Sequence, residues 1–196
     1  MKATQEIQKQ IKASPAGQLF SVATFHHAAS YENTRKILGR LATAGTIKRV
    51  ARGIYVRPKQ VPYVGETLPS PIEIVQMISQ STGEVIAIHG AEAARRLQLT
   101  TQVPMQPVFY TTGNTREIKT GNRTIFLQRI SPRKLVAPGT IAGTVISALW
   151  FLGKSNTTQE VVAKIKQQLS AEEFQQVLNN IAHMPAWMAS LFYQYQ

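Results

Sequence analysis

The chain has 196 residues, enough for one or two domains with their own hydrophobic cores. Its 43% apolar content argues against wholesale disorder, and the absence of cysteine excludes disulfides and thiolate chemistry. The formal net charge is +12 and is unevenly spread, because residues 1–60 hold 11 Lys and Arg against two Glu. No apolar run could span a bilayer and the N-terminus is polar, so we expect a cytoplasmic protein that does not enter a membrane.

The first 58 residues predict helices followed by a hairpin. A short amphipathic helix is expected over Glu6–Ala13, and after the apolar run at 19–22 a second helix that Thr24 caps. The main helix follows Ser30, whose hydroxyl can accept a hydrogen bond from a free amide, and ends before Gly45, which can adopt a left-handed conformation. Its predicted buried stripe consists of Thr34, Ile37, Leu38 and Leu41.

Two β-rich runs, Ile47–Val50 and Ile54–Val56, predict a basic hairpin. Helix, basic helix and basic hairpin follow one another as in a winged helix-turn-helix, where the second helix enters the DNA major groove. The alternative is a solvated basic helix beside an ordinary hairpin, but here the cations lie opposite the apolar stripe and acids are nearly absent. The expected DNA-binding residues are Tyr31, Asn33, Arg35, Lys36, Arg40, Lys48, Arg49, Arg52 and Arg57.

The proline-rich segment 59–71 is expected to be a linker between a DNA-binding domain (1–58) and a second domain (72–196). The further elements are expected as helices over 72–81 and 91–97, strands over 85–88, 108–111, 116–120 and 123–129, and helices over 142–152, 160–169, 170–182 and 186–195. The predicted class is therefore α+β: an N-terminal winged helix-turn-helix, a small mixed α/β domain and a helical C-terminal tail.

Residues suited to catalysis are scarce. The chain contains no Asp, and it lacks phosphate-loop, dinucleotide-binding, GxSxG and HExxH motifs. We therefore expect no enzyme, no catalytic residue, no cofactor and no metal site. For the adjacent His26 and His27 we expect one packed and one exposed ring, and for His89, between a strand and a helix, a structural hydrogen bond rather than a role as general base.

Three segments resemble a known family. RKILGRLATAGTIKRVARGIYVRP (Arg35–Pro58) looks like the winged-helix domain of the AbiEi-type antitoxins of type IV toxin–antitoxin systems. HGAEAARRLQLTTQVPMQPVFYTTG (His89–Gly113) and IKTGNRTIFLQRISPRKL (Ile118–Leu135) resemble the second domain of a short AbiEi-like subgroup. The resemblance implies a DNA-binding repressor of its own operon, next to a gene for a nucleotidyltransferase-like toxin. It maps the DNA-reading helix to Tyr31–Ala44 and the wing to Ile47–Val56.

Two functions follow from these observations. The first is a DNA-binding transcriptional regulator, the antitoxin and autorepressor of its operon, acting as a homodimer on an inverted repeat because one winged helix reads few base pairs. The C-terminal aromatic residues Trp150, Phe151, Trp187 and Phe192 are then either a dimer surface or core. The alternative is a protein-interaction module that neutralises a toxin or other partner by direct contact, without sequence-specific DNA binding. It would use Arg95-Arg96 and Arg133-Lys134 instead.

Overall fold

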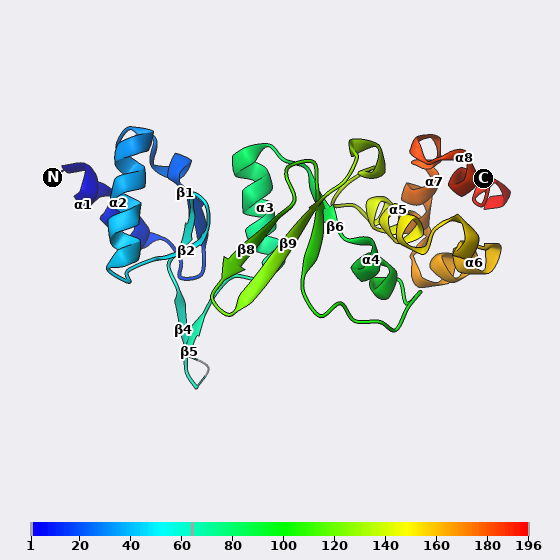
Figure 1. Ribbon diagram of the computed structural model, residues 1–196, viewed down its shortest axis with the longest axis horizontal. Helices are drawn as coiled ribbons and strands as arrows, with labels where there is room; N and C mark the ends of the chain where they lie inside the picture. The colour runs from blue at the N-terminus through cyan, green and yellow to red at the C-terminus, as the bar shows by residue number, and fades with distance from the viewer. Residues whose placement is uncertain (1, 64, 196) are drawn as a thin grey trace. The chain divides into compact units, whose positions relative to one another are not determined.

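The computed structural model describes residues 2–63 and 65–195 and has an α+β fold with several small sheets (Figure 1). The chain divides into two compact units. The first unit is Met1–Glu84 with Glu117–Ile125, and the second unit is Val85–Arg116 with Phe126–Gln196. This division does not fall in segment 59–71, where we expected a linker; it falls after Glu84.

The first unit begins with two helices that share one core. Helix α1 (Lys2–Ala13) buries Ile7 and Ile11, and helix α2 (Tyr31–Thr43) buries its whole predicted stripe. Between them lie strand β1 (Leu19–Ser21) and the 3-10 turn η1 (Val22–Phe25). Because apolar residues recur at helical spacing on both helices, each has one inward face and leaves its other face exposed.

The ends of α2 confirm two predictions. The Ser30 hydroxyl accepts a hydrogen bond from the Asn33 amide at 3.4 Å, and Gly45 has φ +75°. The helix expected after Thr24 is wrong, since the chain forms only the short turn η1. The Thr24 hydroxyl accepts a bond from the Ser21 amide (3.1 Å), so Ser21 is the capping residue and Thr24 lies inside the turn.

The predicted basic hairpin is confirmed and belongs to a three-stranded sheet of order β1-β3-β2. Strands β2 (Lys48–Ala51) and β1 both pair antiparallel with the central β3 (Ile54–Val56). Tyr55 packs in the core with α1 and α2, whereas Ile54 and Val56 point to the opposite face and are also buried. Helix α3 (Pro71–Thr82) packs against β1 and β2, so the sheet is covered on both faces.

The segment expected to be a linker contains a second hairpin, β4 (Lys59–Val61) and β5 (Gly65–Thr67), which projects from the rest of the first unit (Figure 1). Helix α3 follows. Ser70 and Glu73 form a capping box at its start, and Gly83, with φ +73°, ends it. The prolines of this segment thus flank short strands and begin a helix, and they do not produce an extended linker.

A four-stranded sheet has the order β6-β7-β9-β8. Strand β6 (Ile86–Ile88) pairs antiparallel with β7 (Val108–Thr111), and β7 pairs parallel with β9 (Arg123–Arg129). Strand β8 (Arg116–Thr120) neighbours β9 across the predicted turn at Gly121-Asn122, where Gly121 has φ +57°. The strands expected here are therefore confirmed to within one residue.

The second unit is completed by helices α4 (Gly90–Arg96), α5 (Ile141–Leu152), α6 (Gln159–Gln168), α7 (Ala171–Leu178) and α8 (Ala186–Ala189), which share one core (Figure 1). The last two predicted helices are too long, because the chain turns into the 3-10 segments η4 (Ile181–His183) and η5 (Tyr193–Tyr195). In the described part of the chain, no helix is long and apolar enough to cross a membrane.

The C-terminal aromatic residues mostly belong to this core. Phe192 is fully buried, and the rings of Trp150 and Trp187 meet edge to face at 5.9 Å. Phe151 differs, with 42% of its surface exposed. Of the four residues considered as a dimer surface, all of which are described, Phe151 is the most exposed.

Two helical glycines should respond oppositely to alanine. A Cβ at Gly143 in α5 would lie 2.2 Å from the Ala137 carbonyl oxygen, whereas one at Gly39 in α2 would meet nothing within 4 Å. We expect Gly143→Ala to lower the free energy of unfolding by about 1–3 kcal/mol through backbone displacement. Gly39→Ala should raise it by about 0.5–1 kcal/mol, because alanine favours helix. Urea denaturation measures both, and a Gly143→Ala variant as stable as the parent would contradict the packing at Gly143.

Candidate nucleic-acid interface

The outer face of α2 is polar and basic. Tyr31 is 61% exposed, and Asn33, Lys36 and Arg40 are exposed with it. Arg35 lies beside them and forms an exposed ion pair with Glu32 at 3.0 Å. The inward stripe of α2 fixes the rotation of the helix, so these side chains must face solvent.

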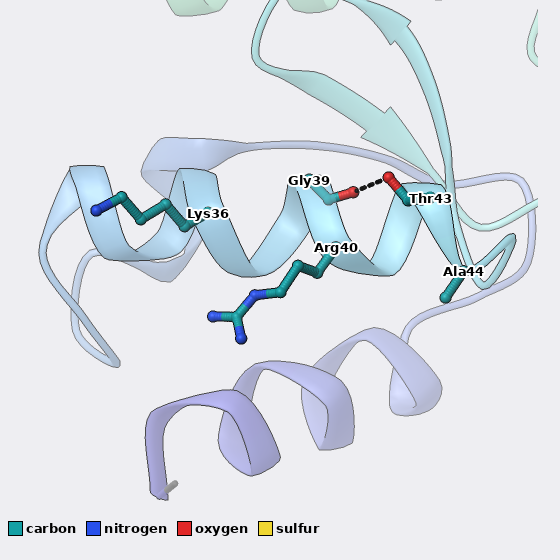
Figure 2. A pocket seen from close by; sticks show the side chains of 5 residues that line it. All are labelled: Lys36, Gly39, Arg40, Thr43 and Ala44. Atoms are coloured by element: carbon teal, nitrogen blue, oxygen red, sulfur yellow. Dashed lines mark hydrogen bonds between the residues drawn. The ribbon is translucent and has the colours of Figure 1, made fainter.

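A hollow follows this face of α2 (Figure 2). It has a volume of about 680 Å³ and is lined by Lys36, Gly39, Arg40, Thr43 and Ala44. A Cβ atom at Gly39 would meet nothing within 4 Å, so the surface is open there, and the Thr43 hydroxyl donates a hydrogen bond to the Gly39 carbonyl (3.1 Å). Within the described residues neither Lys36 nor Arg40 forms an ion pair. The hollow is therefore an open, positively charged surface.

The β2–β3 hairpin supplies three further predicted cations. Arg52 lies in the exposed turn and has no side-chain partner among the described residues, whereas the Arg49 Nε atom donates to the Ala51 carbonyl at 3.3 Å. Lys48 forms an ion pair with Glu66 of β5. An exposed pair of this kind contributes little to stability, so Lys48 can exchange Glu66 for another anion at low cost.

Arg57, predicted to contact phosphate, instead caps the C-terminal end of α1. Its Nη1 atom donates to the Lys12 carbonyl at 2.8 Å, and Nη2 donates to the Ser14 carbonyl at 2.5 Å. The last carbonyls of a helix have no intrahelical donors. The guanidinium satisfies the one of Lys12 and the carbonyl of Ser14, which follows the helix, and it opposes the negative end of the helix dipole. These two bonds already occupy the guanidinium, so Arg57 is less available to a phosphate than the exposed cations Lys36 and Arg40 of α2.

Two cations that sequence reasoning missed flank the turn of the β8–β9 hairpin. Lys119 and Arg123 are exposed, and Thr120 between them is 5% exposed. The Thr120 hydroxyl donates to the Val50 carbonyl of β2 at 2.9 Å, which fixes this turn beside the basic hairpin although 70 residues separate them in the sequence. No local pattern in the sequence could have indicated this proximity.

The first unit as a whole is strongly basic. It holds 13 Lys and Arg residues against six Glu. Among its described residues, Arg35 forms an ion pair with Glu32 and Lys48 forms one with Glu66. Most of its cations are therefore uncompensated, which is the electrostatic footprint of a surface that attracts phosphates.

The histidines of the first unit are both exposed, so the expectation that one ring is packed is wrong. The His26 Nδ1 atom lies 3.0 Å from the Ala23 carbonyl, and the His27 Nε2 atom lies 2.7 Å from the Gln10 side chain. Residues 2–63 and 65–195 contain no group of three or more His, Cys, Asp or Glu side chains that could hold a metal ion.

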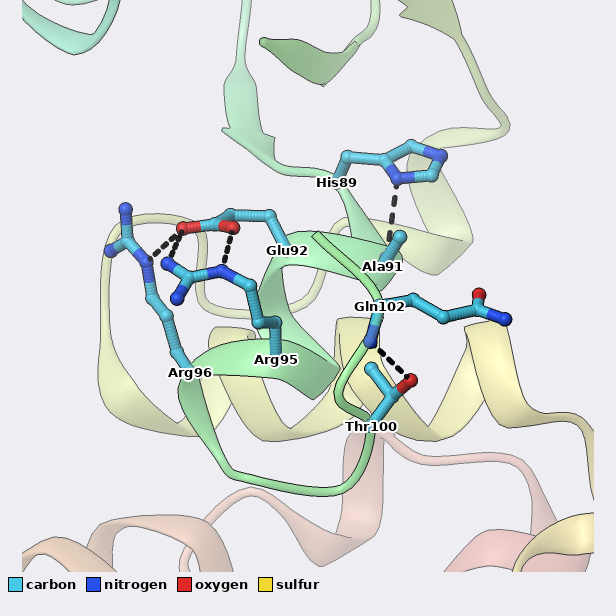
Figure 3. A network of polar contacts seen from close by, with 7 residues as sticks. All are labelled: His89, Ala91, Glu92, Arg95, Arg96, Thr100 and Gln102. Atoms are coloured by element: carbon cyan, nitrogen blue, oxygen red, sulfur yellow. Dashed lines mark hydrogen bonds and ion pairs between the residues drawn. The ribbon is translucent and has the colours of Figure 1, made fainter. Parts of the chain in front are cut away.

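His89 makes the predicted structural hydrogen bond in the second unit. Its Nδ1 atom accepts a bond from the Ala91 amide at 3.2 Å, so it caps α4 (Figure 3). Its ring lies against Tyr110, with centroids 4.6 Å apart, and near Phe151. Burial among these rings lowers the pKa of His89, and a hydrogen bond with Gln128 partly opposes the shift. The neutral form of the imidazole is therefore favoured.

The two arginines of α4 are already paired. Arg95 and Arg96 donate to the Glu92 carboxylate at 2.7 and 2.9 Å (Figure 3). The hydrogen bond from Arg95 is the main reason that the pKa of Glu92 falls to about 2, so this carboxylate stays ionised. These arginines, which a protein-binding function was expected to use, are thus partly neutralised within their own helix.

A model of a protein family of unknown function, DUF6088, matches residues 6–177. The chain belongs to this family. The structure is similar to the crystal structure of the RV2827C protein from Mycobacterium tuberculosis, with a TM-score of 0.46. The two sequences are 10% identical, and the match covers 96% of this chain and 80% of that chain. None of the curated proteins matches this DUF6088 member in sequence.

Replacing Arg57 tests its structural role. We expect Arg57→Ala to lower the free energy of unfolding by about 1.5–3 kcal/mol, because two carbonyls at the end of α1 lose a charged donor. Arg52→Ala, in the exposed turn, is the matched control and should change stability by no more than about 0.5 kcal/mol. Both are measured by urea denaturation, and equal effects of the two substitutions would disprove the cap.

The stability of the protein should also depend on His89 near neutral pH. Because the folded pKa is below the ordinary value of 6.5, the unfolded chain binds this proton more readily, and stability falls as the pH drops from above 6.5 through the folded pKa. His89→Asn keeps a capping side chain and removes the titration, so the fall should become shallower. The free energies of unfolding of the parent protein and of His89→Asn, measured between about pH 7.5 and pH 5, show this difference. Identical pH profiles for the two proteins would refute this.

Proposed function

We propose that the protein binds double-stranded DNA through a winged helix-turn-helix in its first unit and represses transcription of its own operon. The observation that supports this most strongly is the pair Lys36 and Arg40, which are exposed, form no ion pair within the described residues, and both line the hollow on α2. A helix inserted in the major groove needs such a face, with the opposite face packed in its domain.

The proposal gives each group of residues a role. Asn33 and Arg40 have the side chains that pair with adenine and guanine, and Lys36 and Tyr31 lie on the same face. Arg49 and Arg52 contact phosphates from the hairpin, together with Lys48 once it leaves Glu66. The further cations beside this hairpin, Lys119 and Arg123, extend the phosphate contacts.

The operon context of the proposal comes from the resemblance to AbiEi-type antitoxins. In that context the protein is the antitoxin and autorepressor of a type IV toxin–antitoxin system with a nucleotidyltransferase-like toxin. It binds an inverted repeat as a homodimer, because one reading helix covers only a half-site. Light scattering at micromolar concentration should give twice the monomer mass, and a monomer with or without operator DNA would refute the dimer.

The function is tested by a mobility shift with the DNA upstream of the gene and with unrelated DNA of equal length, each at two salt concentrations. We expect preference for the upstream DNA that persists at the higher salt, because base contacts depend less on counterion release than phosphate contacts do. Equal binding to both DNAs that disappears with salt would leave only a non-specific basic surface.

Paired substitutions then separate base reading from phosphate contact. Lys36→Ala with Arg40→Ala should reduce the preference for upstream DNA, by about 1–3 kcal/mol for each base that is no longer hydrogen-bonded. Arg49→Ala with Arg52→Ala should weaken binding to both DNAs and reduce the slope of log K against log salt by about 2. Lys154→Ala with Lys164→Ala, exposed cations of the second unit, is the control. If that control pair lowers affinity as much as the others, the proposed interface is wrong.

A further inference from the structure

A cavity within the second unit is not used by the DNA-binding proposal. It has a volume of about 780 Å³, within the usual range for small-molecule sites. Its residues come from the 3-10 turn η2 (Pro132–Lys134) and the residues on either side of it, from Trp150 in α5, and from η4 with the residues on either side of it. The side chains that matter here are Arg133, Lys134, Trp150, Asn180, His183 and Met184.

The polar part of the lining is cationic. Arg133 and Lys134 both contribute to it, no Glu lines it, and within the described residues neither cation forms an ion pair. Asn180 and His183 add hydrogen-bonding groups, although the Asn180 amide nitrogen also donates to the Gln176 carbonyl at 2.8 Å. A concave site with two uncompensated positive charges attracts an anion, and both cations can donate hydrogen bonds to carboxylate or phosphate oxygens.

The remaining wall is aromatic and apolar. The Lys134 Nζ atom lies 4.7 Å from the centre of the Trp150 ring, so a cation and an aromatic surface meet at the same place. Met184 is 8% exposed and contributes apolar surface. The buried Trp150 indole N–H has no hydrogen-bond partner among the described residues. An aromatic or apolar ligand can pack on such a wall.

We infer that this cavity binds a small organic anion, a molecule that carries a carboxylate or phosphate on a planar or apolar body. Arg133 and Lys134 hold the anionic group, Asn180 and His183 supply hydrogen bonds, and the body of the ligand packs against Trp150 and Met184. The ligand needs both a ring and a negative charge, because the cations bind only the charge and the apolar wall binds only the ring. The site lies wholly within residues 126–196, so its test is independent of the DNA-binding assay.

The full-length protein offers a direct readout, because its two tryptophans are Trp150 and its neighbour Trp187. We would titrate tryptophan fluorescence with phenyl phosphate and phenylacetate, each of which has a ring and a charge. Benzyl alcohol supplies the ring alone, and inorganic phosphate supplies the charge alone. We expect saturable changes with the two aromatic anions, with dissociation constants on the order of 1 mM or below, and weaker binding of the other two probes.

Variants assign the binding to the cavity. Lys134→Gln and Arg133→Gln should each weaken phenyl phosphate binding about tenfold, as expected when one charge-assisted hydrogen bond is removed. Lys154→Gln, an exposed lysine outside the lining, should bind as the parent does. Isothermal titration calorimetry gives the same constants without relying on fluorescence. The inference is overturned if neither aromatic anion binds, if benzyl alcohol binds as tightly as phenyl phosphate, or if both cavity variants bind unchanged.

Discussion

The burial of β3 on both faces is the constraint on which the first unit depends. Tyr55 packs against the helices on one side, and Ile54 and Val56 are enclosed on the other. Each such side chain is worth roughly 1.5–3 kcal/mol when it leaves water, so three consecutive buried residues fix the strand and its register. The helices must then turn their apolar stripes toward the sheet. The exposure of the basic face of α2 follows from this packing alone, whatever the function of that face.

The cations of the first unit differ in what they can still bind. Arg57 is committed to the fold, because its two hydrogen bonds complete the end of α1. Lys48 and Arg35 are held only by exposed ion pairs, which a phosphate could replace at little cost. Lys36 and Arg40 have no ion pair among the described residues and need no exchange at all. A count of basic residues treats all five alike, whereas their hydrogen bonds and ion pairs separate a structural residue from those available to a ligand.

Features that depend on neighbouring residues could be predicted from the sequence. Ser30 caps α2, Gly45 ends it, and Gly121-Asn122 joins β8 to β9, because caps and tight turns are decided within a few residues. One error came from competing local choices, because Ser21 and Thr24 can both cap a turn. The proline-rich segment 59–71, predicted to be a linker, contains a hairpin.

The parts of the candidate site that escaped prediction depend on contacts between distant residues. The hydrogen bond from Thr120 to Val50 brings Lys119 and Arg123 beside the basic hairpin, and the bonds from Arg57 to the end of α1 withdraw a predicted contact. In both cases the sequence around one residue contains no pattern that identifies the distant residue it contacts. Residue type indicated where positive charge was concentrated, but only the tertiary structure could show which charges were already used.

Trp150 contacts both the core and the cavity of the second unit. Its ring packs against Trp187 in the core, and Lys134 lies over the ring at the cavity. A side chain packed on both sides transmits what happens in the cavity to the helices around it, because close-packed interiors yield little at any one point. An anion that draws Lys134 away from the ring would therefore alter the packing of Trp150 against Trp187. The cation–π contact between Lys134 and Trp150 therefore couples the proposed ligand site to the packing of the core.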